Sequence, residues 1–305
     1  MHDLIIIGAG PAGLTAGLYA GRYRLNALIL EKMVPGGQIL WSEKIENFPG
    51  FPSGVYTQEL VDRMKKQLEE LQIAIENDEC LQVVSDRGVS YTVKTQSNVF
   101  QAKSIIIASG AGPKRLNVQG EEQFIGRGVS YCGTCDGPLF KNKEIAVIGG
   151  GNSAIEEALY LTTYAGKVHV IHRRQGLRAS GILEEKAQHN PKINFILDSV
   201  IEEIIGKNRV EGIRIKNVKT DASAQLACEG VFIFVGIEPN TLFVKNLLNV
   251  DESGFIITQP DMGTAREGIF ACGDCIKKSL YQVVNACGEG AVAADSAHKY
   301  LLNRG

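Results

Sequence analysis

The pattern of apolar and polar residues repeats one arrangement twice. An apolar run at residues 4–7 is followed by a glycine-rich turn and a helix-like stretch that ends near residue 23. The same order returns at residues 145–148, where a second glycine-rich turn leads into a helix-like stretch that ends near residue 164. A buried strand, a turn and a helix make up the first half of a βαβ unit, so the pattern predicts two such units.

Each unit continues into a second strand, at residues 27–30 in the first and 168–171 in the second. Glu31 lies 23 positions after Gly8, and His172 lies 23 positions after Gly149. The two units therefore align along their length, and a difference between Glu31 and His172 indicates a difference in ligand.

The remaining pattern predicts an amphipathic helix over residues 60–71, buried strands at 105–107 and 231–236, and a small-residue helix over 283–301. Gly112-Pro113 is a plausible boundary, and Glu238-Pro239-Asn240 is expected to form a turn and a second linker. We therefore expect an α/β protein with two Rossmann-like, three-layer nucleotide-binding domains. Residues 1–112 and 241–305 would form one domain, and residues 113–240 would be inserted in it as the second.

Composition and charge narrow the possible partners. At 305 residues, 44% hydrophobic and 22% charged, the chain is long enough for two compact domains, although length alone also allows one large barrel. The net charge of −2 and the lack of long basic runs argue against nucleic acid as a ligand, and no apolar run reaches the roughly 18 residues of a membrane span. The N-terminus lacks the features of a secretory signal, and the odd number of seven cysteines favours a reducing cytoplasm.

The first glycine-rich turn has the spacing of a dinucleotide-binding motif. Gly8 permits the tight turn, Gly10 lets a pyrophosphate approach the backbone, and Gly13 lets the helix pack on the strand. Glu31 at the end of the second strand can accept hydrogen bonds from ribose hydroxyl groups. The turn also contains Pro11 and Ala12.

The second unit carries positive charge where the first has a carboxylate. His172 is followed by Arg173, Arg174 and, slightly later, Arg178. Guanidinium groups bind a 2′-phosphate, whereas a carboxylate would repel it, so NADPH is expected in preference to NADH. Two other interpretations stay open: the arginines could be solvated surface residues, and Ser153 with Glu156 could form a helix capping box without any nucleotide.

Cys132-Gly133-Thr134-Cys135 is the candidate chemical centre, because two cysteines at this spacing can close a reversible disulfide. Asp136 follows directly and could protonate a departing thiolate or a flavin-derived anion. A second CxxC, Cys272 to Cys275, raises the alternative of a four-thiolate zinc site. We favour the redox pair and expect no metal, because Gly273-Asp274 suits a flavin contact and neither loop resembles a zinc knuckle.

Taken together, these motifs resemble, in order and spacing, the low-molecular-weight thioredoxin reductases of the class II pyridine nucleotide-disulfide oxidoreductases. The resemblance covers almost the whole chain. It implies that the two chain ends form an FAD domain, that the inserted domain binds NADPH and carries the CxxC, that the enzyme is a homodimer, and that one domain rotates against the other. The motifs that carry it are Gly8 to Gly13, Pro35 to Gln38, Glu46 to Gly50, Cys132 to Gly137, Gly149 to Glu157, His172 to Arg174, and Ala271 to Asp274.

The resemblance also implies roles for individual residues. Cys135 would lie against the flavin, Cys132 would attack the disulfide of thioredoxin or a thioredoxin-like protein, and Asp136 would donate the proton. Gln38, Asn47 and Gln282 would lie near the flavin ring and Asp274 near its ribityl or pyrophosphate part. The expected cofactor contacts further include Lys32, Gly37, Gly110 and Gly273 for FAD, and Gly149, Gly151, Asn152 and Ser153 for NADPH.

The chain departs from the family pattern at three places. Tyr281 stands where an arginine is common, Gln175-Gly176-Leu177 replaces an acidic and aromatic continuation of the basic motif, and Cys272 and Cys275 occur in some relatives as small buried residues. Alternative functions are therefore a related flavoenzyme that uses NADH, reduced ferredoxin or a small-molecule acceptor, and a nucleotide-binding or metal-binding protein without turnover.

Overall fold

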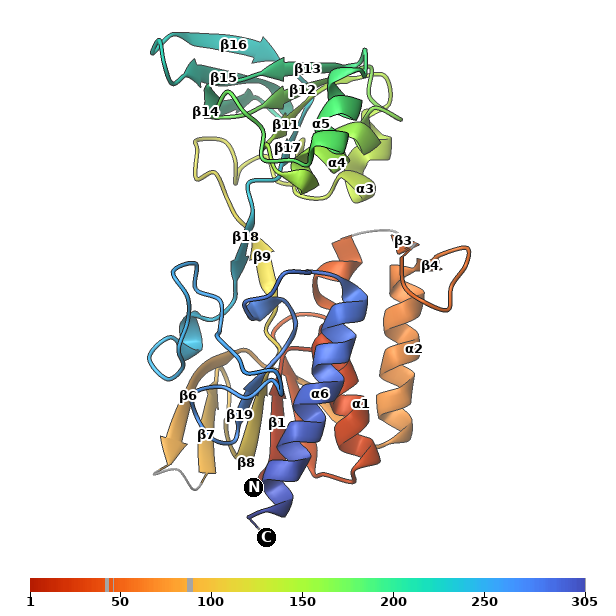
Figure 1. Cartoon of the computed structure of the whole chain (residues 1–305), viewed down its shortest axis with the longest axis vertical. Helices are drawn as coiled ribbons and strands as arrows, with labels where there is room; N and C mark the ends of the chain where they lie inside the picture. Colours follow the sequence, from red (N-terminus) through yellow and green to blue (C-terminus); the bar gives the residue numbers. More distant parts are fainter. Residues whose placement is uncertain (42–43, 46, 87–89, 305) are drawn as a thin grey trace. The chain divides into compact units, whose positions relative to one another are not determined.

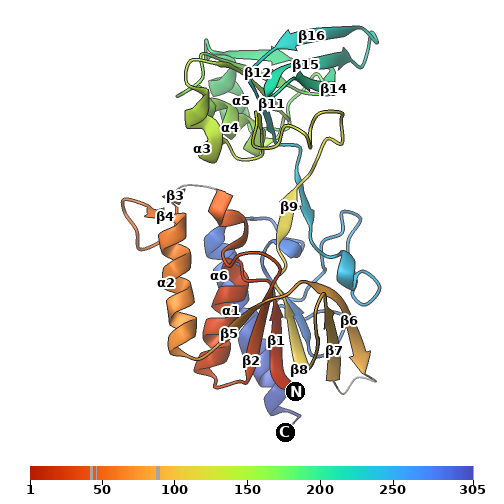
Figure 2. The ribbon, with the colours of Figure 1, turned by 180° about the vertical axis from the view of Figure 1, so that it is seen from behind.

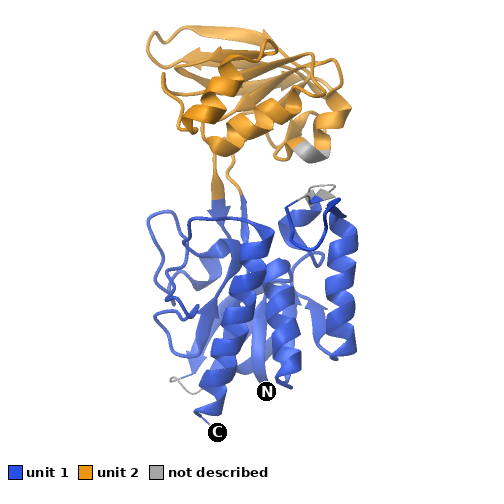
Figure 3. Cartoon of the chain, turned by 45° about the vertical axis from the view of Figure 1, so that its right-hand side comes forward, with its two compact units in different colours: residues 1–112, 238–305 blue, residues 113–237 orange. Residues whose placement is uncertain are grey.

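The structure is a computed structural model that describes residues 1–41, 44–45, 47–86 and 90–304, apart from the side chains of residues 41, 44, 134 and 135. The chain forms two compact units, coloured separately in Figure 3. Unit 1 consists of Met1–Gly112 and Glu238–Gly305, and unit 2 consists of Pro113–Ile237. The first unit is therefore built from both ends of the sequence.

The sheet of unit 1 has a parallel centre extended by an antiparallel meander. β1 (His2–Ile7) lies between β2 (Ala27–Glu31) and β8 (Val99–Ile107). Because Leu4 to Ile7 are buried on both faces of the sheet, they form a continuous apolar run instead of an alternating one. The other strands of this sheet are β5 (Ala74–Asn77), β6 (Cys80–Asp86), β7 (Ser90–Thr95) and β19 (Ile269–Ala271), of which β19 pairs with β8.

Three helices, α1 (Pro11–Arg22), α2 (Thr57–Glu70) and α6 (Val283–Leu302), lie on one side of this sheet (Figures 1 and 2). α1 and α6 approach closely, because a Cβ atom at Gly290 would lie 2.2 Å from the carbonyl oxygen of Ala12. Small residues thus let α6 pack beside the first turn of α1. The shorter elements of unit 1 are η1 (Gly37–Trp41), β3 (Lys44–Ile45), β4 (Val55–Tyr56), η3 (Leu242–Val244) and η4 (Gly273–Cys275).

Unit 2 repeats the strand-turn-helix arrangement around a smaller parallel sheet. The strand order is β10 (Val129–Ser130), β17 (Gly230–Ile233), β11 (Glu144–Ile148), β12 (Lys167–Ile171) and β13 (Ile193–Ile196). The helices are α3 (Gly133–Asp136), η2 (Gly137–Phe140), α4 (Asn152–Leu161) and α5 (Gly181–Gln188). An antiparallel sheet of β14 (Ser199–Gly206), β15 (Val210–Asn217) and β16 (Ser223–Ala227) completes the unit. One mixed sheet with a parallel centre and one parallel sheet, each packed against helices, confirm the predicted α/β class.

Two predictions about local structure are wrong. The expected turn at residues 238–240 belongs largely to a strand, because β18 (Ile237–Pro239) pairs with β9 (Ala111–Pro113). Pro239 and Pro113 have no N–H group to donate, and they are tolerated because both strands of this two-stranded sheet are edge strands. The helix expected through residue 164 ends earlier, at Leu161, where Thr162 is its C-cap.

Among the described residues, no helix is long and apolar enough to cross a membrane.

Candidate active site

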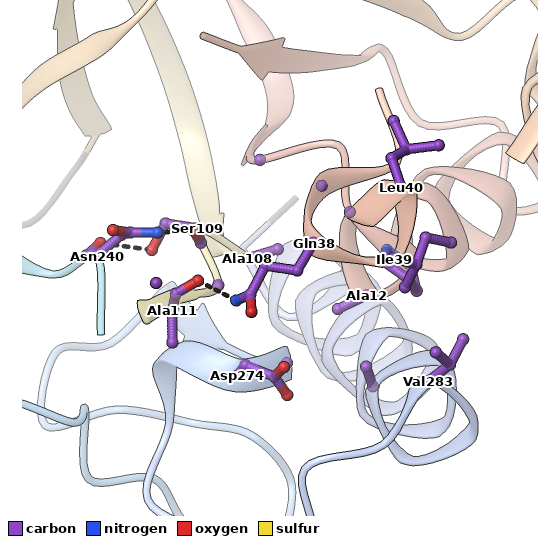
Figure 4. Close-up of a pocket in the computed structure, with 18 of the residues that line it drawn as sticks. Ala12, Gln38, Ile39, Leu40, Ala108, Ser109, Ala111, Asn240, Asp274 and Val283 are labelled. Carbon is purple, nitrogen blue, oxygen red and sulfur yellow. Dashed lines mark hydrogen bonds between the residues drawn. The ribbon is translucent and has the colours of Figure 1, made fainter. Parts of the chain in front are cut away.

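A cavity of about 550 Å³ lies in unit 1 where the carboxyl ends of β1, β2 and β8 meet the start of α1 (Figure 4). Ligands of open α/β sheets bind at this edge of the strands. The cavity is lined by twelve of the residues expected to contact FAD: Gly8, Gly10, Pro11, Ala12, Glu31, Lys32, Gly37, Gln38, Gly110, Gly273, Asp274 and Gln282. They come from segments far apart in the sequence, so the fold brings the expected contacts together.

Two of the expected FAD residues do not line the cavity. A Cβ atom at Gly13 would lie 1.8 Å from the carbonyl oxygen of Gly8, so Gly13 serves the close packing of α1 on the turn. Asn47 donates a hydrogen bond from Nδ2 to Oε1 of Gln282 over 2.9 Å. Asn47 therefore supports Gln282, which does line the cavity.

The glycines of this turn have different physical roles. Gly8 has a φ of 107°, in the left-handed region that favours glycine, and its missing Cβ makes room for the backbone of Ala108. Gly10 is the N-cap of α1, and no atom lies within 4 Å of the place where its Cβ would stand. The space beside Gly10 is thus open to a ligand, and the first N–H groups of α1 lack helical partners.

The carboxylate of Glu31 is held by the backbone on both of its oxygens. The N–H of Ala9 donates to Oε2 over 2.7 Å, and the N–H of Met33 donates to Oε1 over 3.0 Å. These bonds link the end of β2 to the glycine turn and fix the carboxylate at the cavity wall. A carboxylate oxygen has lone pairs left to accept a ribose hydroxyl group.

Polar groups from both ends of the chain meet on another wall. Gln38 donates through Nε2 to the carbonyl oxygen of Ala111 (Figure 4). Ser109 donates through Oγ to the carbonyl oxygen of Asn240 over 2.7 Å, and Nδ2 of Asn240 donates to the carbonyl oxygen of Ser109 over 3.0 Å. These bonds fix the backbone after β8, where Gly110 lines the cavity.

Asp274 is coupled to a buried lysine. Nζ of Lys278 lies 3.1 Å from Oδ1 of Asp274 and 2.9 Å from Oε2 of Glu289. Burial by itself would lower the pKa of Lys278, but the contacts with Glu289 and Asp274 outweigh it and raise this pKa. The same ammonium group lies 5.3 Å from the ring centroid of Tyr281, within the range of a cation–π contact. A positive charge from Lys278 is therefore close to position 281, where an arginine is common in the family.

Sequence reasoning missed much of the lining. Ser109 and Asn240 carry no local motif, and they meet only because the chain returns to unit 1 after residue 237. The apolar lining residues have no signal of their own either, because apolar side chains occur throughout the chain, in the core and on the surface alike. These missed residues are Met33, Val34, Ile39, Leu40, Ala108, Ala111, Val283 and Ala286.

The glycine turn of unit 2 has the same open geometry. Gly149 has a φ of 147°, and a Cβ there would lie 2.3 Å from the carbonyl oxygen of Phe234. Gly151 is the N-cap of α4, and no atom lies within 4 Å of its Cβ position. Oδ1 of Asn152 accepts the N–H of Ser180 over 2.8 Å. Because the N-cap is Gly151 and has no side-chain bond, the capping-box interpretation of Ser153 is wrong, and Ser153 is exposed.

The basic segment after β12 divides into a buried ring and exposed cations. His172 is 5% exposed, and its ring lies against Gly150, where a Cβ would be 2.5 Å from Nδ1. Burial first, then the charges of Arg178 and Arg173, lower the pKa of His172. Arg173, Arg174 and Arg178 are exposed, and within the described part of the chain no ion pair involves them. His172 therefore packs beneath the turn, whereas the guanidinium groups are available to an anion.

The candidate redox centre lies at the start of α3. Cys132 is disulfide-bonded, its N–H donates to Oγ of Ser130 over 3.1 Å, and its carbonyl oxygen accepts the N–H of Asp136 over 3.3 Å. The side chain of Cys135 lies outside the described part of the structure, so its pairing with Cys132 stays a prediction. Asp136 ends the same short helix and is half-buried.

Cys272 and Cys275 have a different character. Both are free, and both are completely buried. Burial raises the pKa of Cys272 well above its usual value and that of Cys275 to about 11. Such thiols are protonated at neutral pH and react slowly. Among the described residues, no group of three or more His, Cys, Asp or Glu side chains is arranged to hold a metal ion.

Comparison with known proteins agrees with this geometry. Residues 2–290 match the pyridine nucleotide-disulphide oxidoreductase family. The chain is 43% identical over 302 residues to the thioredoxin reductase of Listeria monocytogenes, covering 99% of this chain and 94% of that protein. It is 44% identical to the crystal structure of Lactococcus lactis thioredoxin reductase in its FR conformation, with a TM-score of 0.87 and coverage of 99% and 100%. A ferredoxin-flavin thioredoxin reductase from Clostridium acetobutylicum is more distant, at 30% identity, a TM-score of 0.54 and coverage of 99% and 98%.

Proposed function

The chain belongs to the pyridine nucleotide-disulphide oxidoreductase family, and we propose on that premise that it is an NADPH-dependent thioredoxin-disulfide reductase. The observation that carries the proposal is the presence of two different nucleotide-binding turns and a disulfide-bonded Cys132 in one chain. The overall reaction takes two electrons and a proton from NADPH, with a second proton from solvent, and turns a thioredoxin disulfide into two thiols.

The cavity of unit 1 fits FAD. Gly10 leaves room for a pyrophosphate beside the first N–H groups of α1, and the carboxylate of Glu31, held at the end of β2 by the N–H of Ala9, would accept hydrogen bonds from the ribose. Gln38 and Gln282 would orient the flavin ring, and the ammonium group of Lys278 would hold Asp274 in place. Bound FAD supplies the hydride acceptor and the electron pair for the disulfide.

The second turn fits NADPH better than NADH. The pyrophosphate would lie at Gly151 and the start of α4, with Asn152 and Ser153 beside it. The guanidinium groups of Arg173, Arg174 and Arg178 would bind the 2′-phosphate, which NADH lacks. His172 would act indirectly, because its buried ring packs against Gly150 and so supports the glycine turn.

At the dithiol, the roles follow from chemistry and from the family. Cys132 would attack the thioredoxin disulfide as a thiolate and form a mixed disulfide. Cys135 would then attack the Cys132 sulfur, which restores the Cys132–Cys135 bond and releases reduced thioredoxin as a thiolate that takes up a proton. Asp136, which ends the same short helix, would donate the proton that a leaving thiolate needs. We further propose that the protein works as a homodimer in the cytoplasm.

Anaerobic reduction tests the proposal. The purified protein should be yellow, NADPH should bleach the flavin absorbance, and NADH at the same concentration should do so far more slowly. With catalytic amounts of protein, NADPH should reduce thioredoxin, which in turn reduces an aromatic disulfide. Bleaching by reduced ferredoxin alone would replace the donor, and a colourless protein that holds zinc would remove the proposal altogether.

A further inference from the structure

A buried acid lies beneath the helix that carries Cys132. Glu157 belongs to α4, and its Oε2 atom is buried without a hydrogen-bond partner among the described residues. A Cβ atom at Gly133 would lie only 2.0 Å from that oxygen. The carboxyl group therefore touches the backbone of the residue that directly follows Cys132.

Two glycines let α3 and the following turn rest on α4, beside which α3 lies in Figures 1 and 2. Gly133 meets Glu157, and a Cβ at Gly137 would lie 3.0 Å from Cδ2 of Leu161. One contact is apolar and the other is an acid. An apolar side chain would pack equally well against Gly133, so packing alone does not require a carboxyl group there.

Burial, and then the neighbouring charge of Glu156, raise the pKa of Glu157, while the N–H of Gly133 opposes this shift. The other titratable residues on α4 and on the elements that pack against it are Tyr160 on α4, Cys135 and Asp136 on α3, Glu184, Glu185 and Lys186 on α5, Glu144 on β11, and His169 and Lys167 on β12. The redox-active residue next to the contact along the chain is Cys132, which directly precedes Gly133.

The carboxyl group is close enough to respond to a thiolate. Oε2 of Glu157 lies within roughly 7 Å of the Cα atom of Cys132. This follows from its contact with Gly133 and from the spacing of about 3.8 Å between neighbouring Cα atoms. A negative charge on sulfur disfavours a second negative charge on Glu157, and the reverse holds equally. At such a separation the titration of a Cys132 thiolate and that of Glu157 would be coupled.

We propose that Glu157 is a positioning residue for the CxxC turn whose carboxylate takes up a proton when the Cys132 disulfide is reduced and releases it on reoxidation. The proposal rests on the proposed function for its physiological electron donor. In the reduction step the S–S bond accepts two electrons and one proton to give a thiol and a thiolate. Glu157 accepts a second proton from solvent, so that electrons and protons arrive in equal number.

The redox equilibrium with dithiothreitol from pH 6 to 8 tests this coupling without NADPH or thioredoxin. The holoprotein is equilibrated with mixtures of reduced and oxidised dithiothreitol, its thiols are trapped with iodoacetamide, and fragment masses give the reduced fraction of Cys132. Dithiothreitol releases two protons with its two electrons and the wild type takes up two, so the wild-type equilibrium constant should not change with pH. Glu157→Gln keeps the size and a carbonyl acceptor but takes up only one proton, so its constant should rise about tenfold for each pH unit. Glu185→Gln, which removes an exposed carboxylate from α5, should behave as the wild type does.

An equilibrium constant for Glu157→Gln that is as independent of pH as that of the wild type would overturn the proposal. Should this variant fail to fold, difference infrared spectra of the wild type decide the matter, because a protonated carboxyl band must grow when dithiothreitol reduces the protein. No such growth would also overturn it. Either failure leaves flavin bleaching and thioredoxin turnover intact, whereas loss of those activities with normal coupling would refute the proposed function alone.

Discussion

Substituting alanine for two glycines of the same turn should separate folding from FAD binding. A Cβ atom at Gly13 would lie 1.8 Å from the carbonyl oxygen of Gly8, closer than the 3.0 Å below which real Cβ contacts essentially do not occur. The turn or α1 would therefore have to move by more than about 1 Å in a close-packed core. At Gly10 the corresponding position has no atom within 4 Å, and its φ of −73° suits alanine.

The two substitutions should consequently differ in magnitude and in kind. Overpacking costs about 1–3 kcal/mol and occasionally more, and the gain in helix propensity returns at most about 1 kcal/mol. Gly13→Ala should thus lose about 2 kcal/mol, which lowers the Tm of the FAD-free protein by about 4–8 °C. Gly10→Ala loses only the small N-cap preference of glycine, about 1 kcal/mol or less. Its methyl group, however, enters the cavity beside the proposed pyrophosphate, so its FAD affinity should fall at least about tenfold, or 1.4 kcal/mol.

Thermal denaturation of the wild type, Gly13→Ala and Gly10→Ala, before and after addition of FAD, measures both the stability and the FAD affinity. Gly288→Ala is the matched control, because Gly288 is an exposed position in α6, has open space at its Cβ and does not line the cavity. It should stabilise the protein by up to about 1 kcal/mol and leave FAD binding unchanged. A Gly10→Ala protein that binds FAD like the wild type would refute the assignment of the pyrophosphate to this turn. A Gly13→Ala protein of undiminished Tm would refute the packing argument.

Three further predictions concern unit 2. Replacing Arg173, Arg174 and Arg178 together with alanine should raise the KM for NADPH about 10- to 100-fold in steady-state kinetics, because charge-assisted bonds to the 2′-phosphate are lost. The KM for NADH should change little, and equal losses with both nucleotides would contradict this prediction. Cys132→Ser should keep bound FAD and hydride uptake but lose thioredoxin turnover, and unimpaired turnover would remove Cys132 from its role. The pKa of His172 is lowered in the folded protein, so the unfolded chain binds a proton at this residue more readily than the folded protein does. The free energy of unfolding should therefore fall as the pH drops below about 6.5. In urea titrations at pH 5 and 7, His172→Gln should reduce that fall.

Local patterns were enough to predict the two strand-turn-helix units. Gly8, Gly13 and Glu31 belong to one short segment whose spacing is fixed by the length of a strand and a helix, so their relation is visible in the sequence. Leu4 to Ile7 are apolar without interruption, which is typical of a parallel strand buried on both faces.

Contacts between distant segments were not visible in the same way. Ser109 and Asn240 exchange two hydrogen bonds across 131 positions of sequence, and neither residue type is unusual in a loop. The capping box at Ser153 was wrong because the N-cap of α4 is Gly151, two residues earlier, so that Ser153 already lies inside the first turn of the helix. In the sequence Glu157 is one of two adjacent glutamates in a helix, and its buried carboxyl group and its contact with Gly133, which distinguish it from the exposed Glu156, are visible only in the structure.

The most direct test of the account is an anaerobic titration with NADPH, followed by the flavin spectrum. The wild-type protein should consume one NADPH for its disulfide and a second for its flavin, and oxidised thioredoxin should then restore the yellow colour. Cys132→Ser, which has no disulfide to reduce, should consume only one. Equal consumption by the two proteins, or a reduced wild-type flavin that thioredoxin fails to reoxidise, would contradict the transfer of electrons through Cys132.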